Sequence, residues 1–325
     1  MENLEKIITV KGRKFLLKVE TSQRALDYVK YEELRNEIWG FLEDNLPGSR
    51  NMMCENFLHE GSSLFIGIYM EERRGGFKED QEHLVGFAYG FVGVKDKNIA
   101  FKDLNNLWFY SQYTGIRPDF QGYNLGVWIK KFQGEILRDL FGIHTVTCTY
   151  DPLTGINAYR NVHTFGMEVL EYRVATYGEY GGYLNRLDVP TDRFFLGWDL
   201  QRECLRPAYD FPSLLDRRPR ILGTEHIRIQ GKTRLLELEK VKEVCLCSEE
   251  KFLLVQIPFD FYLMLRETDV PDNEIRNIPV EWRMKTRLAF LELFRRGYKV
   301  IDFKTAEGPK PESFYILTKP KASTE

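Results

Sequence analysis

A glycine-bearing turn at residues 121–126 is the part of the sequence best suited to bind an anion. Gly122 and Gly126 would let a phosphate approach the backbone, and Asn124 is among the few non-glycine residue types that tolerate positive φ. A helix is expected to begin directly after this turn. The first N–H groups of a helix, together with its dipole, attract negative charge. The turn therefore predicts a phosphate-binding site.

A second polar group lies on the short helix expected at 157–165. The apolar stripe of this helix consists of Ala158, Val162 and Phe165. Asn157 and Asn161 consequently stand together on the helix surface, about 100° away from that stripe. Their amides could hydrogen-bond a ligand; alternatively, Asn157 caps the start of the helix.

Carboxylates that could act as a general base follow the predicted strands, at Asp151, Glu171 and Asp192. Asp151 is the best placed, just beyond the strand expected at 144–150, although an Asp in this position also favours a turn. Asp192 and Arg193 either orient a substrate or form an ion pair between strands. The tyrosines that could supply a proton are Tyr150, Tyr159 and Tyr172.

Two arginines lie four residues apart on the helix predicted over 279–296. Because such positions share one helix face, Arg283 and Arg287 could clamp a carboxylate together. The alternative is a solvated or salt-bridged helix face.

Hydrophobic periodicity and turn residues predict the elements that must position these side chains. Strands are expected at 6–19 (a pair around Lys11-Gly12), 63–70, 83–94, 106–116, 144–150, 167–177, 193–200, 252–257, 298–303 and 313–317. Helices are expected after Thr21-Ser22 and at 125–140, 157–165 and 279–296. The proline- and arginine-rich stretch 206–220 is typical of a linker, so we expect a domain at 1–205 and a smaller α/β domain at 221–325.

The motifs resemble those of the GNAT superfamily of acyltransferases, and of a subfamily that carries a C-terminal α/β extension. Residues 116–126 are similar to the superfamily motif Q/R-x-x-G-x-G/A, with Asn124 in place of the middle glycine. Further matches are Asp151-Pro152-Leu153, Asn157-Ala158, Phe165-Gly166-Met167, Tyr177-Gly178, Pro190-Thr191-Asp192-Arg193, Trp282-Arg283 and Gly297-Tyr298. The resemblance covers nearly the whole chain. It implies a mixed α/β fold whose central, mostly antiparallel sheet is flanked by helices.

The resemblance also implies a coenzyme A site. The pyrophosphate would contact the backbone of Gln121, Gly122, Tyr123, Asn124, Leu125, Gly126 and Val127. The pantetheine amides would pair with the strand edge at 113–116, which includes Thr114, Gly115 and Ile116. Asn157 would hydrogen-bond the pantetheine arm, and Asn161 is a second candidate. The family commonly has a tyrosine general acid where this chain has Val162, so that role is filled elsewhere or is absent.

The implied function is an N-acyltransferase that moves an acetyl or succinyl group from CoA to the amine of a small molecule, with amino acids among the candidate acceptors. The candidate catalytic residues are Asp151, Tyr150, Glu171 and Asp192, and the candidate substrate-binding residues are Arg193, Arg283 and Arg287. The alternative is a regulatory or scaffold protein that binds acyl-CoA without turnover.

Composition favours a cytoplasmic protein that needs no metal. The 325 residues carry a net charge of −2, which does not steer the chain toward nucleic acid or an anionic membrane. No charged and then apolar leader opens the sequence, and its apolar stretches are about half as long as a membrane span. The cysteines, Cys54, Cys148, Cys204, Cys245 and Cys247, are too scattered for a zinc site. Cys148 is expected to be a small core residue, and the oligomeric state is not fixed.

Overall fold

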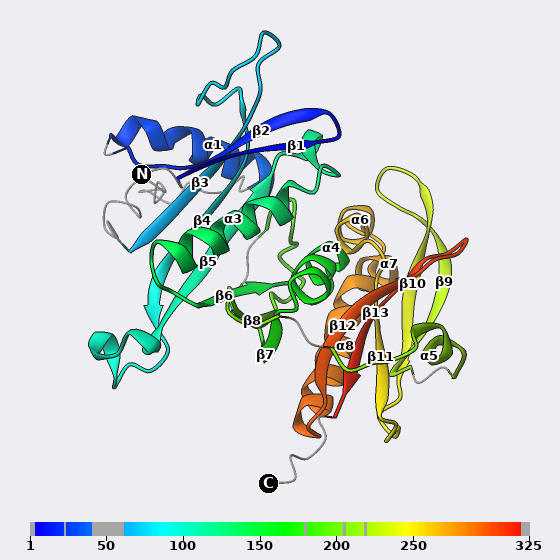
Figure 1. The fold of residues 1–325 in the computed structure, drawn as a ribbon. Helices are drawn as coiled ribbons and strands as arrows, with labels where there is room; N and C mark the ends of the chain where they lie inside the picture. Colours follow the sequence, from blue (N-terminus) through cyan, green and yellow to red (C-terminus); the bar gives the residue numbers. More distant parts are fainter. Residues whose placement is uncertain are drawn as a thin grey trace. The chain divides into compact units, whose positions relative to one another are not determined.

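The computed structural model describes residues 4–22, 24–40, 62–178, 181–203, 206–217 and 220–319 (Figure 1). Contacts along the chain divide it into two units, Met1–Cys148 with Asp199–Arg202, and Thr149–Trp198 with Glu203–Glu325. Residues 149–198 thus belong with the C-terminal part, on the other side of the linker expected at 206–220. The sequence-based division into a 1–205 domain and a 221–325 domain stays a prediction.

The first unit is built on strands that follow the predicted ranges closely. In hydrogen-bonded order they are β1 (Glu5–Val10), β2 (Arg13–Val19), β3 (Ser63–Met70), β4 (Leu84–Val94), β5 (Leu107–Ile116) and β6 (Thr145–Tyr150), whose last two residues belong to the second unit. Every neighbouring pair is antiparallel except β5 and β6, which are parallel. The prediction of a mostly antiparallel sheet is confirmed.

Helices α1 (Val29–Trp39) and α3 (Leu125–Asp139) flank this sheet (Figure 1). Aromatic rings attach α1, because Tyr31 lies 5.3 Å from Phe65 and 6.1 Å from Phe87 between ring centroids. The three- and four-residue spacing predicted for α3 is confirmed by its buried residues, among them Leu125, Ile129, Phe132 and Ile136. Short 3-10 helices lie at η1 (Ala25–Tyr28), η2 (Ala100–Lys102), η3 (Leu104–Asn106) and η4 (Pro118–Phe120).

The second unit contains three separate strand pairings. Strand β7 (Glu168–Arg173) is antiparallel to β8 (Arg193–Asp199), and β9 (Leu222–Gln230) is antiparallel to β10 (Leu235–Val244). A three-stranded antiparallel sheet has the order β11 (Phe252–Ile257), β13 (Glu312–Thr318) and β12 (Lys299–Ala306), so the last strand along the chain is the central one. The helices of the second unit are α4 (Gly155–Ala158), the π-helix η5 (Tyr159–Thr164), α5 (Phe211–Arg217), α6 (Phe261–Glu267), α7 (Asn273–Arg276) and α8 (Ile278–Arg295).

One aromatic core holds the second unit together. The ring of Phe194 on β8 lies 4.8 Å from Phe290 on α8 and 5.5 Å from Tyr315 on β13, centroid to centroid. It also lies 5.6 Å from Tyr172 and 5.9 Å from Tyr150. Since aromatic side chains bury large apolar areas, these contacts join residues 149–198 to the C-terminal α/β part in a single core.

Three features of the second unit differ from the predictions. The expected linker contains α5, in whose first turn Pro212 is tolerated because a helix start leaves that N–H unbonded in any case. Strands β9 and β10 were not predicted, since their charged residues interrupt the apolar pattern. The two-residue spacing of Cys245 and Cys247 suits one face of a strand, but both lie just after β10, as exposed free thiols. Cys54 and Cys204 lie outside the described residues.

Candidate functional site

The predicted phosphate-binding turn has the backbone conformation that its sequence requires. Gly122 has φ +82° and Asn124 has φ +58°, both in the left-handed region. Asn124 directly precedes α3, and its side chain makes no capping hydrogen bond to the helix. No capping side chain therefore occupies the N–H groups of Leu125 and Gly126, whereas the N–H of Val127 donates to the Asn124 carbonyl at 3.0 Å.

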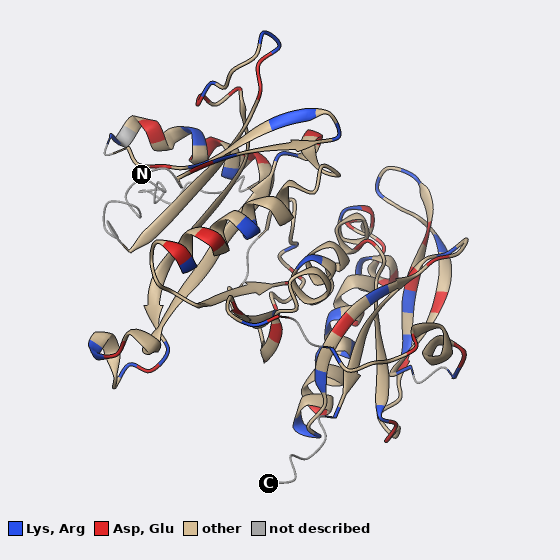
Figure 2. Ribbon diagram, viewed as in Figure 1, with Lys and Arg blue, Asp and Glu red and all other residues tan. Residues whose placement is uncertain are grey.

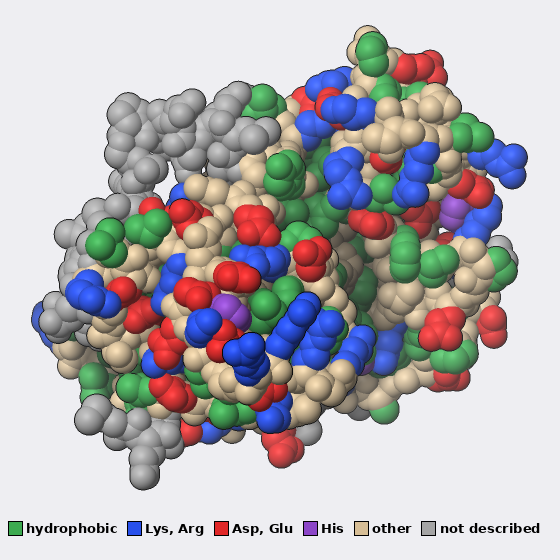
Figure 3. Space-filling model, turned by 90° about the horizontal axis from the view of Figure 1, so that it is seen from above, with side chains coloured by type: hydrophobic (Ala, Val, Ile, Leu, Met, Phe, Trp, Pro, Cys, Tyr) green, Lys and Arg blue, Asp and Glu red, His purple; other side chains and the backbone are tan. Residues whose placement is uncertain are grey.

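A β-hairpin brings positive charge to this turn. The ammonium of Lys11 lies 5.5 Å from the ring centroid of Tyr123, and the guanidinium of Arg13 lies 5.4 Å from it. Figure 2 shows basic residues at the tip of the β1–β2 hairpin, whereas charges of both signs are interspersed over the face shown in Figure 3. The attraction for an anion is thus local, and it adds to the partial positive charge of the α3 start.

Strand β5 leaves one of its edges unpaired next to the turn. Its parallel pairing with β6 is limited to Phe109 with Val146 and Tyr110 with Thr147. On the other side, β5 stays paired with β4 as far as Ile116. Within the described residues, therefore, no strand covers residues 111–116 on the β6 side. This segment includes the predicted pantetheine edge at Thr114, Gly115 and Ile116.

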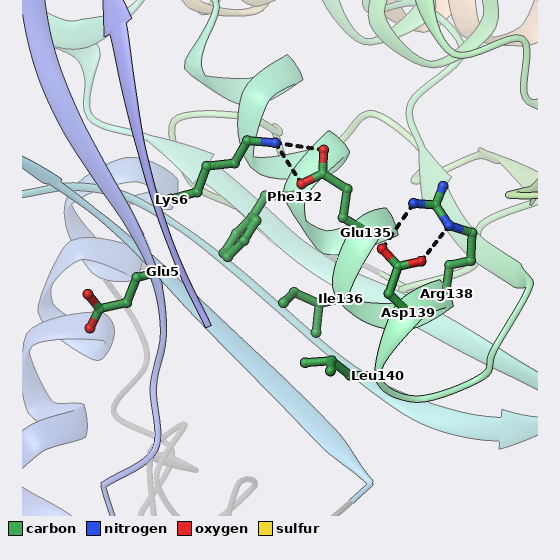
Figure 4. A pocket seen from close by; sticks show the side chains of 8 residues that line it. All are labelled: Glu5, Lys6, Phe132, Glu135, Ile136, Arg138, Asp139 and Leu140. Carbon is green, nitrogen blue, oxygen red and sulfur yellow. Dashed lines mark hydrogen bonds and ion pairs between the residues drawn. The ribbon is translucent and has the colours of Figure 1, made fainter. Parts of the chain in front are cut away.

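The cavity drawn in Figure 4 does not include the predicted phosphate-binding turn. It encloses about 340 Å³ at the C-terminal end of α3 and is lined by Glu5, Lys6, Phe132, Glu135, Ile136, Arg138, Asp139 and Leu140. None of these residues was predicted to bind CoA. Its cations are already paired, Lys6 with Glu135 at 2.6 Å and Arg138 with Asp139 at 2.7 Å. The cavity offers no unpaired cation to an anionic ligand.

In the second unit, the two predicted asparagines have different surroundings. The amide of Asn157 donates to Thr154 at 3.0 Å and accepts from Arg160 at 2.6 Å. Asn161 is 3% exposed, and its Oδ1 has no hydrogen-bond partner among the described residues. Asn161 also lies in the π-helix, an element frequently found at functional sites. Of the two residues, Asn161 has the side chain that still needs a donor.

Asp151 combines the turn and ion-pair roles. Its Oδ1 accepts from the backbone N–H of Leu153 at 2.9 Å, which is the turn expected from its sequence context. Its Oδ2 accepts from Arg283, and from Arg193 at 3.4 Å. The structure therefore brings together three predicted site residues that come from β6, β8 and α8.

Asp192 is fully buried and saturated with donors. It accepts two bonds of 2.8 Å from Arg287, one of 2.7 Å from the Tyr172 hydroxyl and one of 3.0 Å from the Ala175 N–H. Burial raises the pKa of Tyr172 well above its usual value, and the Asp192 carboxylate raises it further, so this phenol stays protonated. The ion pair that Asp192 forms is with Arg287 of α8 and not between strands, and its role in orienting a substrate stays a prediction.

The remaining catalytic candidates lie apart from this cluster or are already bonded. Glu171 is exposed and pairs with Arg173 at 2.7 Å. The Tyr150 hydroxyl lies 3.0 Å from that of Tyr315, which in turn donates to the Pro152 carbonyl at 2.8 Å. Cys148 is buried, as expected of a small core residue.

A further cluster, centred on His163, was not predicted from the sequence. His163 Nδ1 lies 2.7 Å from Asp302, which also accepts from Tyr209 at 2.5 Å, and the His163 ring lies 4.7 Å from the Tyr159 ring at an interplanar angle of 38°. Burial, together with the Asp302 carboxylate, raises the pKa of Tyr209. Because 139 residues separate His163 from Asp302, no local pattern could have joined them.

A comparison with protein-family models and one with curated proteins found no match. Among solved structures, the chain is similar to the ribosomal-protein-S18-alanine N-acetyltransferase from Escherichia coli, with a TM-score of 0.39, 11% identity, and coverage of 59% of this chain and 99% of that one. It is also similar to yncA of Salmonella typhimurium, described as an acetyltransferase and solved with its cofactor acetyl-CoA. The TM-score is 0.38 and the identity 15%, and the match covers 60% of this chain and 98% of that one. For the spermidine/spermine N-acetyltransferase SpeG from Vibrio cholerae, the TM-score is 0.36 and the identity 12%, and the match covers 57% of this chain and 95% of that one.

All three of these solved structures are described as acetyltransferases. Their TM-scores are all below 0.5, so the functional proposal depends on the residues of this chain. Within the described ranges, no helix is long and apolar enough to cross a membrane. The same residues contain no group of three or more histidine, cysteine or acidic side chains that could hold a metal ion.

Proposed function

We propose that this chain is an acyl-CoA-dependent N-acyltransferase that transfers an acetyl or succinyl group to the amine of a small molecule. One observation carries the proposal. The start of α3 has no side-chain cap, two basic residues contact the ring of Tyr123 in the turn before it, and the strand that leads to this turn has an edge that β6 does not cover. Phosphates suit the first two of these features, and a chain of amides suits the third.

The residues of the first unit would hold and orient the donor. The N–H groups of residues 122–126 would receive the pyrophosphate, with Lys11 and Arg13 neutralising its charge. The N–H and C=O groups of residues 114–116 that face away from β4 would pair with the pantetheine amides. Such pairing fixes the thioester in one orientation, which is a main source of rate enhancement in acyl transfer. In the second unit, Asn161 is the proposed amide partner, with Asn157 as the alternative.

The chemistry further requires a neutral amine and a proton for the departing thiolate. Asp151 and Asp192 already accept from arginines, which supports a positioning role for both carboxylates in preference to proton transfer. Tyr150 and Glu171 remain candidates for the proton-transfer steps. Val162 is buried at the position where the family commonly has its tyrosine acid, and this favours the second candidate function, a binding protein without turnover.

Calorimetric titration with CoA tests the phosphate turn. Gly126→Val should weaken binding at least tenfold, about 1.4 kcal/mol, because a branched side chain blocks backbone approach. Gly122→Ala has a matched control in Gly142→Ala, since both glycines have positive φ and open space where a Cβ would be added. Only the Gly122 variant should lose CoA affinity. Unchanged affinity in a folded Gly126→Val protein would defeat the assignment.

Release of CoA thiol that depends on an added amine separates the two candidate functions. Slow thiol release without amine is hydrolysis and does not decide between them. Tight CoA binding with no amine-dependent release from any acceptor tested would favour the binding protein.

A further inference from the structure

The Arg283 side chain is fully buried in the second unit. It is 0% exposed on α8, and its Nη2 donates to Asp151. Its Nε and Nη1 atoms have no hydrogen-bond partner among the described residues. One face of the guanidinium lies 5.3 Å from the Phe261 ring centroid. Two directions in which this arginine donates are therefore left without an acceptor.

Unsatisfied N–H groups in this setting are costly. Each buried donor without an acceptor destabilises a fold by about 1–3 kcal/mol, and a charged donor by more. Burial by itself would lower the pKa of Arg283, but the attraction of Asp151 outweighs it and the pKa is raised. The guanidinium stays charged, and an acceptor for it is expected.

A negatively charged acceptor fits better than a neutral one. Arg193 and Arg283 donate to the same oxygen of Asp151, so two like charges lie close together in a buried region. A second anion beside Arg283 would relieve their repulsion. Arg287 provides a contrast on the same helix, because Asp192 already accepts from both its Nε and its Nη2.

We propose that Arg283 binds a carboxylate of one of the substrates. This inference rests on the proposed N-acyltransferase function and names a substrate class for it. The carboxylate belongs either to the acceptor, which is then an amino acid, or to the acyl group, which is then a dicarboxylic acid joined to CoA at one end. A carboxylate brings the single negative charge that one guanidinium can balance, whereas a phosphate brings nearly two.

The variants Arg283→Lys and Arg283→Met test the site. Lysine keeps a positive charge for Asp151 but lacks the planar set of donors, whereas methionine leaves Asp151 with Arg193 as its partner. Arg287→Lys is the control, since it disturbs an ion pair of the same helix that has no missing acceptor. All three variants should be less stable than the wild type, and only the two Arg283 variants should lose carboxylate recognition.

The assay measures amine-dependent thiol release from acetyl-CoA and from succinyl-CoA. The acceptors are a panel of L-amino acids and the matching amino acid amides. We expect the wild type to prefer the carboxylate-bearing member of one comparison at least tenfold in kcat/KM, and the Arg283 variants to retain less than about a threefold preference, with most of the loss in KM. Preference for amino acids over amides assigns the carboxylate to the acceptor. Preference for succinyl-CoA assigns it to the acyl group.

Thermal unfolding gives a readout that does not need turnover. Sodium acetate, compared with sodium chloride at equal ionic strength, should raise the melting temperature of the wild type and of Arg287→Lys, but not of Arg283→Met. If acetate stabilises the protein but no acceptor causes amine-dependent release of CoA thiol, the proposed N-acyltransferase function is wrong and the carboxylate site is still supported. The inference is overturned if the wild type shows neither a carboxylate preference nor this stabilisation, or if the Arg283 variants keep them. Ordered water would then be the acceptor.

Discussion

The buried amide of Asn161 and the satisfied amide of Asn157 should respond differently to substitution. Asn161→Leu removes an acceptor that has no partner in the described part of the chain, so the melting temperature should stay the same or rise. If the amide bonds the pantetheine arm, CoA affinity should fall by about 1 kcal/mol in calorimetric titration.

Asn157→Ala is the matched variant on the same helix face. It removes the bonds to Thr154 and Arg160, so it should lower the melting temperature. Normal CoA affinity in Asn161→Leu would contradict the assignment of that residue. A loss of affinity in Asn157→Ala alone would return the role to Asn157.

At the scale of single residues, local conformation was predictable and distant partners were not. The positive φ of Gly122 and Asn124 follows from residue type, and the turn at Asp151 follows from its neighbours. The partner of Asp151 lies 132 residues away on α8. Spacing placed Arg283 and Arg287 on one face, but only the fold shows that each contacts a different carboxylate.

The β1–β2 hairpin is the element whose contribution to ligand binding is easiest to isolate. Replacing both Lys11 and Arg13 by Gln removes two exposed charges near the start of α3. Exposed charges contribute roughly 0.2–1 kcal/mol each, so the loss of two should lower CoA affinity about two- to thirtyfold at low salt. The difference from wild type should shrink as salt screens the interaction.

Two exposed lysines elsewhere in the first unit give the control for this experiment. Lys97→Gln with Lys102→Gln changes the net charge equally, at exposed positions in and just before the 3-10 helix η2. Equal losses in the two double variants would mean that net charge, and not the hairpin, determines the effect.

Elements were predictable where apolar residues recur with a clear period. Strands β3 and β11 have the predicted bounds, and α8 begins and ends within one residue of them. Strands β9 and β10 were not predicted because their charged residues obscure the alternation of apolar and polar residues. The two strands are held by the hydrogen bonds of their pairing with each other. The π-helix within the predicted 157–165 helix has no sequence signature of its own.

For the molecule as a whole, the core shared around Phe194 predicts how a shortened chain would behave. A fragment of residues 1–205 lacks α8 and β13, so Asp151 and Asp192 lose Arg283 and Arg287, and Phe194 loses Phe290 and Tyr315. We expect proteases to cut this fragment within residues 149–198, a region that they should leave intact in the full chain. Mass spectrometry of the limited digest identifies the cut sites.

A cut near Arg217 in the full chain provides the comparison. The two pieces should remain associated on gel filtration, because residues 149–198 and the C-terminal part share one core. A 1–205 fragment that resists proteolysis throughout and unfolds in one cooperative transition would show that the predicted domain boundary is the physical one.

The position of β13 has a consequence for how the protein is made. The ribosome synthesises β11 and β12 before β13, the strand that lies between them. Neither β11 nor β12 can therefore form its strand pairing in this sheet until β13 follows. Asp151 likewise waits for Arg283, 132 residues later. At a synthesis rate of about 5–20 residues per second, that interval is about 7 to 26 s. Until β13 follows, the nascent chain exposes the unpaired β11 and the aromatic side chains around Phe194, and we expect chaperones that bind hydrophobic segments during translation to bind the second unit.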